Sequence, residues 1–521
     1  MSGDKGTMGR VQPHRKALVA MTPRSGRRNP RPFRRALNGA AGALAAVLAL
    51  AFTAAGPPGG PPPAARERPV QVHLTTTSDP GGRHVVKGLE SQRPLRFTRG
   101  GPPHRGVTLT VDGSTTYQTF QGGGASFTDT AAWLLKGSGA LSKATREATM
   151  KRLFDPRDGI GLSFLRNPMG ASDLARFDYT YDDLPAGRAD PQLKHFSIGH
   201  DLAGVLPLTA EARRLDPALR VMAVPWSAPA WMKDNGSLDQ GRLRAQYYAV
   251  YARYFVASLR AYRAHGVPVD YVSVQNEPTC CAGYPSMRWT GRDLARFTKR
   301  DLLPALAGAR LPTKVLALDW NWNRYPAFGA PTVDDPAIRR HPNFGGVAWH
   351  GYGGDVGEQT RVHRRYPGLV MYDTEHSGGR WIADQQREDM HDLIDYTRNW
   401  GSSWIRWSLA VDQNGGPHHG GCGSCTGLLT VHHGDAAQGT VDYTIEYYTM
   451  GHLTKFVRPG ARRIASTASA AVPNVAWRNP DGSLALIAYN DSAAARSVTI
   501  NWQGEQATYR LPPRASATFT W

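Results

Sequence analysis

Apolar and polar positions follow one repeated order between residues 117 and 457. Short apolar runs end at Gly or Pro and are followed by stretches with helical spacing, in which Tyr247, Tyr251 and Tyr254 share one face and Thr290 would cap the next helix. The apolar runs are expected to form eight strands, at 120–125, 162–166, 221–224, 271–274, 314–318, 347–350, 369–372 and 404–409. Eight strand–helix units predict an α/β fold with a (β/α)8 TIM barrel. A doubly wound open sheet is the alternative, but no Gly-rich phosphate loop opens the first unit.

The two ends of the chain have a different pattern. From residue 464 onward the helical spacing disappears, and short alternating runs follow at 475–478, 484–489, 497–502, 507–511 and 516–521. Two further β-like runs, 70–76 and 107–111, precede the barrel and have no strand partners of their own. We therefore expect a small β-sandwich side domain built from residues 70–116 and 458–521, beside a catalytic barrel at 117–457.

Residues 1–55 have the pattern of an export signal. Residues 1–35 hold ten Lys and Arg against one acid, Asp4, and residues 36–55 carry no charge. A Pro/Gly-rich linker, 56–69, follows, with small residues suited to cleavage after Ala55 or Ala65. The expected protein is secreted. A retained N-terminal membrane anchor facing outside is the alternative, because about 20 uncharged residues are just enough to span a bilayer.

This segment changes the meaning of the charge. The chain of 521 residues has a formal net charge of +20 and a pI near 10.0, which favours nucleic acid or an anionic polymer as a partner. Nearly half of that charge belongs to the export signal, and the rest is scattered without a basic stripe interleaved with aromatic residues. Nucleic-acid binding is therefore not expected. A weak association with an anionic cell wall remains an expectation, and no cofactor is predicted.

Polar residues gather directly after the predicted strands. The fourth strand is followed by Gln275-Asn276-Glu277-Pro278, and the seventh by Asp373-Thr374-Glu375-His376. Because the carboxyl ends of barrel strands surround one cavity, Glu277 and Glu375 are expected to face each other across it. Paired carboxylates across a cleft are suited to glycoside hydrolysis.

Seven segments in register extend this interpretation: QGGGASFTDTAAWLL, LSFLRNPMGASD, VPWSAPAWMKDNGSL, VQNEP, AWHGYGG, YDTEHSGG and WSLAVDQNGGP. Together they resemble glycoside hydrolase family 30, close to its glucosylceramidase (acid β-glucosidase) branch, from about residue 105 to the end of the chain. The resemblance implies a retaining mechanism, with Glu277 as acid/base and Glu375 as nucleophile. It also implies a sugar site lined by Asp129, Trp226, Asn276, His350, Tyr352 and Trp407. Arg166 is placed to orient a carboxylate there, or to form a structural ion pair.

One loop departs from the family pattern. After WSLAVDQNGGP the branch supplies an Asn to the terminal sugar, whereas this chain reads HHGGCGSCTGLLTV and has Cys422 at about that position. Disulfides are expected in an exported protein, and a bridge from Cys280 or Cys281 to Cys422 or Cys425 would join the two substrate loops. Free thiols, or a zinc site with His418 and His419, are the alternatives; no metal is predicted. The identity of the sugar stays open.

Three functions follow from these residues. The leading hypothesis is an exported retaining β-glycosidase that hydrolyses β-glucosides in the manner of a glucosylceramidase. An endo-β-1,6-glucanase of the same family is the alternative, because it would use the same two glutamates. A non-catalytic carbohydrate-binding protein on an inactive barrel is the third hypothesis, and the presence of Glu277, Glu375 and Asn276 argues against it. The expected partner is thus a β-glucoside or a β-glucan.

Overall fold

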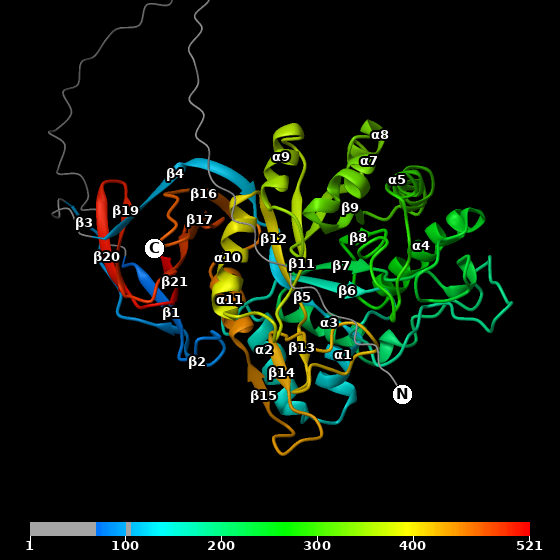
Figure 1. Ribbon diagram of the computed structural model, residues 1–521, viewed down its shortest axis with the longest axis horizontal. Coiled ribbons are helices and arrows are strands. Elements are labelled where there is room, and N and C mark those ends of the chain that lie inside the picture. The colour runs from blue at the N-terminus through cyan, green and yellow to red at the C-terminus, as the bar shows by residue number, and fades with distance from the viewer. Residues whose placement is uncertain (1–68, 100–105) are drawn as a thin grey trace, which may run out of the picture. The chain divides into compact units, whose positions relative to one another are not determined.

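The computed structural model describes residues 69–99 and 106–521, so the predicted export signal lies outside the described residues. Eight parallel strands close into a barrel, with β5 beside β12 (Figure 1). They are β5 (Gly122–Ser126), β6 (Phe164–Pro168), β7 (Arg220–Val224), β8 (Tyr271–Ser273), β9 (Lys314–Asn321), β10 (Phe344–His350), β11 (Met371–Ser377) and β12 (Gly401–Trp407). The predicted TIM barrel is confirmed, and the open sheet is excluded.

The barrel strands are buried on both faces, which the pattern of apolar residues detects only in part. Every residue of β5, β6, β11 and β12 is buried. The strand β11 ends at Ser377, beyond the predicted 369–372, so Glu375 lies within it. Both Asp373 and Glu375 are buried there. Gly124 is required by a close strand contact, because a Cβ there would lie 2.0 Å from the carbonyl oxygen of Phe164.

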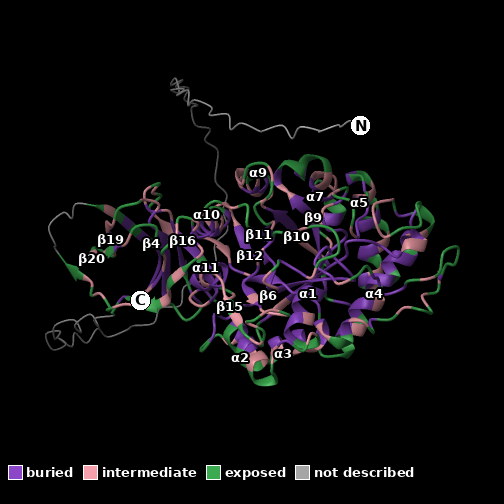
Figure 2. Cartoon of the chain, turned by 60° about the horizontal axis from the view of Figure 1, so that its bottom comes forward, coloured by how far each residue is buried: buried purple, intermediate pink, exposed green. Residues whose placement is uncertain are grey.

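Helices cover the outside of the barrel, and their buried faces point inward (Figure 2). Thr290 caps α5 as predicted, its side chain accepting a hydrogen bond from the Asp293 amide. Within residues 69–99 and 106–521, none of the helices combines the length and the apolar character that spanning a bilayer requires. The helices are α1 (Asp129–Ala132), α2 (Lys143–Phe154), α3 (Val205–Leu215), α4 (Tyr248–Ala264), α5 (Gly291–Phe297), α6 (Leu303–Gly308), α7 (Ala330–Val333), α8 (Pro336–Arg339), α9 (Gly357–Arg365), α10 (Gln385–Arg398) and α11 (Ile445–Thr454).

Both ends of the described chain build the side domain, as predicted. Its ten strands pair in the order β2-β1-β21-β18-β17-β16-β4-β19-β20-β3. The long strand β4 joins the two halves, because its first residues pair with β19 and its later residues with β16. The strands are β1 (Gln71–Thr77), β2 (Val85–Ser91), β3 (Thr98–Arg99), β4 (Val107–Thr119), β16 (Arg462–Ser466), β17 (Asn474–Arg478), β18 (Leu484–Tyr489), β19 (Arg496–Trp502), β20 (Glu505–Leu511) and β21 (Ser516–Thr520).

The barrel and the side domain are joined through α10 and α11. His452 on α11 is fully buried, and its ring nitrogens lie 2.8 Å from the Thr518 hydroxyl and 2.9 Å from the Thr75 hydroxyl. On α10, the Gln386 amide donates to the carbonyl of Thr75 and to the hydroxyl of Ser516. These buried polar contacts link the barrel to strands from both chain ends. A small third sheet, β13 (Ala410–Val411), β14 (Leu429–Val431) and β15 (Val441–Tyr443), follows the last barrel strand.

Candidate active site

Glu277 and Glu375 meet at the carboxyl end of the barrel. Glu277 follows β8 and Glu375 lies in β11, and a carboxylate oxygen of one is within 4.8 Å of a carboxylate oxygen of the other. Both line a cavity of about 190 Å³, here called the glutamate cavity. Its other lining residues are Asp173, Trp226, Asn276, Tyr284, Tyr352, Ser377, Trp381, Trp407, Gly421, Cys422 and Cys425. The expectation that the two glutamates share one cavity is confirmed.

Glu375 is held in place by two hydrogen-bond donors. Arg166 on β6 donates from Nη1 to Oε2 at 2.6 Å, and the Tyr352 hydroxyl donates to Oε1 at 2.9 Å. Nη2 of Arg166 also donates to Oδ1 of Asn276 at 2.7 Å. Both roles expected of Arg166 are therefore met by one side chain, because it forms a buried ion pair and orients the carboxylate of Glu375.

His350, at the end of β10, lies between the two glutamates. Its Nδ1 is 2.9 Å from Oε1 of Glu277 and 3.7 Å from Oε1 of Glu375, and its Nε2 is 3.2 Å from Oδ1 of Asp319. Burial alone would disfavour the imidazolium, but the surrounding carboxylates of Glu375, Asp319 and Glu277 outweigh it and raise the pKa of His350 to about 9. The imidazole is therefore positively charged at neutral pH.

Glu277 has the environment of a carboxyl group that holds its proton. Burial raises its pKa, the contact with His350 opposes this, and the nearby charge of Glu375 adds to the rise. The backbone of Glu277 is in the left-handed region, with φ of 42°, and its amide donates to the Asp319 carbonyl at 3.0 Å. Such a conformation is uncommon for a residue other than Gly and is enriched at functional sites.

Two tryptophans form an apolar wall of the glutamate cavity. Trp226 follows β7 and Trp407 ends β12, and their rings stack with centroids 5.2 Å apart and an interplanar angle of 30°. Aromatic faces of this kind contact the C–H face of a pyranose ring. The structure thus brings together Trp226, Asn276, Tyr352 and Trp407 at the cavity, with His350 and Arg166 directly behind the glutamates.

Asp129 is not brought to this cavity. It begins α1, and its carboxylate is bound by Arg176, with both bonds at 3.0 Å, and by Nε2 of His200 at 2.9 Å. Arg176 and His200 lie in the long connection between β6 and α3. These bonds tie that connection to the start of α1, and the role of Asp129 in sugar binding stays a prediction.

Two acidic residues of the site were not singled out from the sequence. Asp319 in β9 is fully buried and accepts hydrogen bonds from Arg166, Ser273, His350 and Thr374. Its position directly after the fifth predicted strand was the signal that could have identified it. Asp173 lines the glutamate cavity, and burial together with the charge of Glu375 raises its pKa to about 7.

The four cysteines form two disulfides, each within one loop. Cys280 is bonded to Cys281 and Cys422 to Cys425, the latter with Cα atoms 5.5 Å apart. The bridge expected between the two loops is therefore wrong, and so is the zinc alternative, because all four sulfurs are used. The Cys422–Cys425 loop is held instead against the connection between β6 and α3, for example by the hydrogen bond from the Cys422 amide to Asp173 at 3.4 Å.

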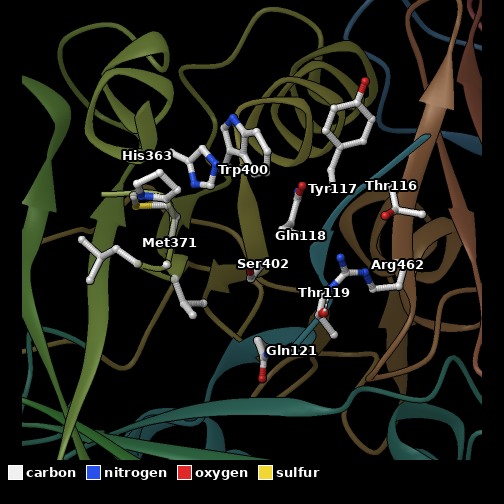
Figure 3. A pocket seen from close by; sticks show the side chains of 14 residues that line it. Thr116, Tyr117, Gln118, Thr119, Gln121, His363, Met371, Trp400, Ser402 and Arg462 are labelled. Carbon is white, nitrogen blue, oxygen red and sulfur yellow. Dashed lines mark hydrogen bonds between the residues drawn. The ribbon is translucent and has the colours of Figure 1, made fainter. Parts of the chain in front are cut away.

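Figure 3 shows a second pocket, of about 430 Å³. Its lining residues place it at the end of the barrel strands opposite to Glu277 and Glu375. Met371 and Ser402, near the starts of β11 and β12, line it, and His363 stacks on Trp400 with centroids 3.4 Å apart. No Asp or Glu is among its lining residues. Of these two pockets, only the glutamate cavity therefore has the chemistry of paired carboxylates.

Comparisons with known proteins agree with this geometry. Residues 120–457 match the model of the glycosyl hydrolase family 30 TIM-barrel domain, and residues 460–519 match that of the glycosyl hydrolase family 30 beta sandwich domain. An endo-1,6-β-D-glucanase of Aspergillus fumigatus is 31% identical over 450 residues, which cover 79% of this chain and 87% of that protein. The lysosomal acid glucosylceramidase of Mus musculus is 28% identical over 425 residues, which cover 76% and 79%.

A solved structure is similar over almost its whole length. The structure of an endo-β1,6-glucanase has a TM-score of 0.77 and 27% identity, and the match covers 87% of this chain and 99% of that one. The similarity thus includes both the barrel and the side domain.

Proposed function

Because this chain belongs to glycosyl hydrolase family 30, we propose that it is an endo-acting β-1,6-glucanase that retains anomeric configuration. The observation that carries the hydrolytic mechanism is the short separation of Glu277 and Glu375, whose oxygens approach within 4.8 Å. Retaining glycosidases place their carboxyl groups about 5–5.5 Å apart, whereas inverting enzymes need about 6.5–9.5 Å to admit a water molecule. The endo-1,6-β-glucanases among the relatives support this substrate over the glucosylceramidase hypothesis.

In the first step Glu375 attacks the anomeric carbon and forms a glycosyl ester. Glu277 gives its proton to the glycosidic oxygen, so the bond from that carbon to the leaving sugar breaks without forming an alkoxide. The raised pKa of Glu277 supports its role as the acid. Arg166 and Tyr352 hold the attacking carboxylate at a fixed angle.

In the second step a water molecule attacks the same carbon and releases Glu375. Glu277, now a carboxylate, takes the proton from that water, and the ester bond breaks. The negative charge is on Glu375 before the first step and on Glu277 once the glycosyl ester has formed. The imidazolium of His350 lies close enough to both glutamates to stabilise it in either place. Asp319 accepts hydrogen bonds from His350 and Arg166, so its carboxylate balances part of the positive charge of these two side chains.

One set of measurements tests the proposal. We expect the enzyme to convert soluble β-1,6-glucan to short oligosaccharides and to release products whose first-formed anomer is β, as seen by proton NMR. A 2-deoxy-2-fluoro β-glucoside should label Glu375, and Glu375→Gln should remove activity. Release of the α anomer would overturn the retaining mechanism.

A β-glucosidase of the glucosylceramidase type is the second candidate. The seven motif segments and the similarity to the lysosomal acid glucosylceramidase support it. Release of glucose from aryl β-glucosides or from glucosylceramide, with no cleavage of β-1,6-glucan, would favour this candidate.

We also propose that the protein is exported and associates weakly with anionic wall polymers. The basic and then uncharged order of residues 1–55 supports export. N-terminal sequencing of the secreted protein should begin after Ala55 or Ala65. A product in the culture medium that still begins at residue 1 would contradict cleavage.

A further inference from the structure

Another cavity, different from the pocket of Figure 3, adjoins the glutamate cavity. Its volume is about 420 Å³, and it is here called the side cavity. It shares Tyr352, Ser377 and Trp381 with the glutamate cavity, so the two are continuous. The remaining lining residues of the side cavity are His376, Ile382, Ala383, Asp384, Arg387 and Glu388. A ligand bound at the glutamates can therefore extend into the side cavity.

Trp381 stands at the junction of the two cavities. Its side chain is 55% exposed, and among the described residues no other tryptophan is exposed. A large apolar ring in water gains free energy when a ligand covers it. The indole therefore has the properties of a stacking surface rather than of a core residue.

The backbone beneath the indole is shaped to receive it. Gly379 lies under the ring, and a Cβ at this position would come within 2.0 Å of the ring carbon Cζ3 of Trp381. Any other residue would displace the indole. One face of the ring thus rests on backbone, and the ring borders both cavities.

The loop that carries Trp381 is fixed from two sides. Arg83, in the connection between β1 and β2, donates from Nη2 to the carbonyl of Gly379 at 2.6 Å and to that of Ile382 at 2.9 Å. On the other side, the Arg380 amide donates to the Ser424 carbonyl at 3.0 Å, next to the Cys422–Cys425 disulfide. A residue held in this way keeps its exposed side chain in one place before any ligand binds, which lowers the entropy cost of binding.

We propose that Trp381 is the stacking platform for a second glucosyl residue of the glucan, next to the residue held between the glutamates, and that Arg83 is the positioning residue of this platform. The proposal rests on the proposed function, because an endo-acting enzyme must bind more than one sugar. The apolar C–H face of the second ring lies on the indole, and the Glu388 carboxylate accepts hydrogen bonds from its hydroxyls. The N-terminal strands of the side domain thereby contribute to substrate binding.

The test compares a polymer with a substrate that has a single sugar. β-Glucosyl fluoride carries no second ring, so its hydrolysis reports the glutamates alone. We expect Trp381→Ala to lower kcat/KM on soluble β-1,6-glucan at least tenfold, mainly through KM, and to change kcat/KM on β-glucosyl fluoride less than threefold. Trp381→Phe should recover most of the loss on the glucan. Phe177→Ala removes another exposed aromatic, 47% exposed and outside both cavities, and should leave both substrates unchanged.

Arg83 gives an independent measurement of the same platform. Arg83→Ala should raise KM for the glucan threefold or more and leave β-glucosyl fluoride unchanged. Binding of a β-1,6-linked oligosaccharide to Glu375→Gln should change the tryptophan fluorescence, and the added substitution Trp381→Phe should remove the part of that change that does not come from Trp226 and Trp407. Equal losses on both substrates in Trp381→Ala, or no loss on either, would overturn the platform. A wild type that hydrolyses β-glucosyl fluoride but not the glucan would overturn the proposed function instead.

Discussion

Arg166 and Glu375 form a buried ion pair inside the barrel, with Nη1 2.6 Å from Oε2. Arg166 is on β6 and Glu375 on β11, and the same guanidinium reaches Asp319 at 2.9 Å. Three strands therefore depend on one cation for the placement of their charged groups. Removing one partner of such a pair leaves a buried charge without compensation.

The first prediction concerns stability. Arg166→Met has a similar volume but leaves Asp319 and Glu375 as neighbouring buried acids, so we expect the free energy of unfolding to fall by about 3–5 kcal/mol. Urea denaturation followed by tryptophan fluorescence would measure this. Unchanged unfolding of Arg166→Met would show that the carboxylates are not charged in the folded protein.

Tyr352→Phe provides the matched comparison at the same glutamate. It removes only the hydroxyl that donates to Oε1 of Glu375 and leaves the ring in place. Because a hydrogen bond to a charged group is worth about 1.5–3 kcal/mol, kcat should fall roughly 10- to 100-fold while the urea midpoint shifts little. A large loss of stability here would mean that the hydroxyl has a structural role.

The second prediction concerns the acid/base role of Glu277. A leaving group that needs no proton should not need Glu277 in the first step, whereas a sugar leaving group should. We expect Glu277→Gln to lose about 10²–10⁴-fold in activity on β-1,6-glucan and far less in the release of dinitrophenolate from 2,4-dinitrophenyl β-glucoside. Glu375→Gln is the isosteric control, and it should lose activity on both. Similar losses for the two substrates in Glu277→Gln would contradict the assignment.

The third prediction concerns Asp173, whose carboxyl group lines the glutamate cavity and has a pKa raised to about 7 by burial and by Glu375. We expect it to bind a hydroxyl of the sugar, at the wall where the loop holds Cys422 instead of an amide side chain. Asp173→Ala should lower kcat/KM about tenfold or more, as for a lost buried hydrogen bond. Asp173→Asn should remove one ionisation near pH 7 from the kcat/KM profile.

Asp178→Asn is the control for Asp173. Asp178 is exposed and lies in the same connection as Asp173, and it pairs at 3.0 Å with His419 of the loop that holds Cys422, without lining the cavity. Its substitution should leave the pH profile unchanged. If Asp178→Asn and Asp173→Asn alter the pH profile alike, the change comes from the whole connection between β6 and α3 and not from the Asp173 carboxyl group at the cavity.

The part of the site that lies on barrel strands was predictable. The carboxyl ends of all eight strands meet at one end of the barrel, so the order of strands was enough to assign Glu277 and Glu375 to one cavity, and the family resemblance added Trp407. Asp319 obeys the same rule, because it directly follows the fifth predicted strand, but this position was not used to single it out.

The loops could not be predicted in this way. Asp129 follows the motif, but Arg176 and His200, from a connection far along the chain, bind its carboxylate. The disulfide pairing depends on Cα separations that spacing alone does not determine. Trp381 also depends on Arg83, which is nearly 300 residues away in sequence. These contacts arise from packing between distant segments, to which neither periodicity nor motif order is sensitive.

The last prediction concerns the junction of the barrel and the side domain. Burial lowers the pKa of His452 to about 3, from its ordinary value of 6.5. Between these values the unfolded chain binds a proton that the folded chain does not, so stability falls as the pH falls, by about 2 kcal/mol between pH 6.5 and 5. His452→Gln keeps a donor and an acceptor for Thr75 and Thr518 but cannot titrate. Urea unfolding at both pH values should therefore show a loss about 2 kcal/mol smaller in this variant than in the wild type, whereas the exposed His265→Gln should behave as the wild type does. An equal loss in all three proteins would show that His452 is protonated in the folded state.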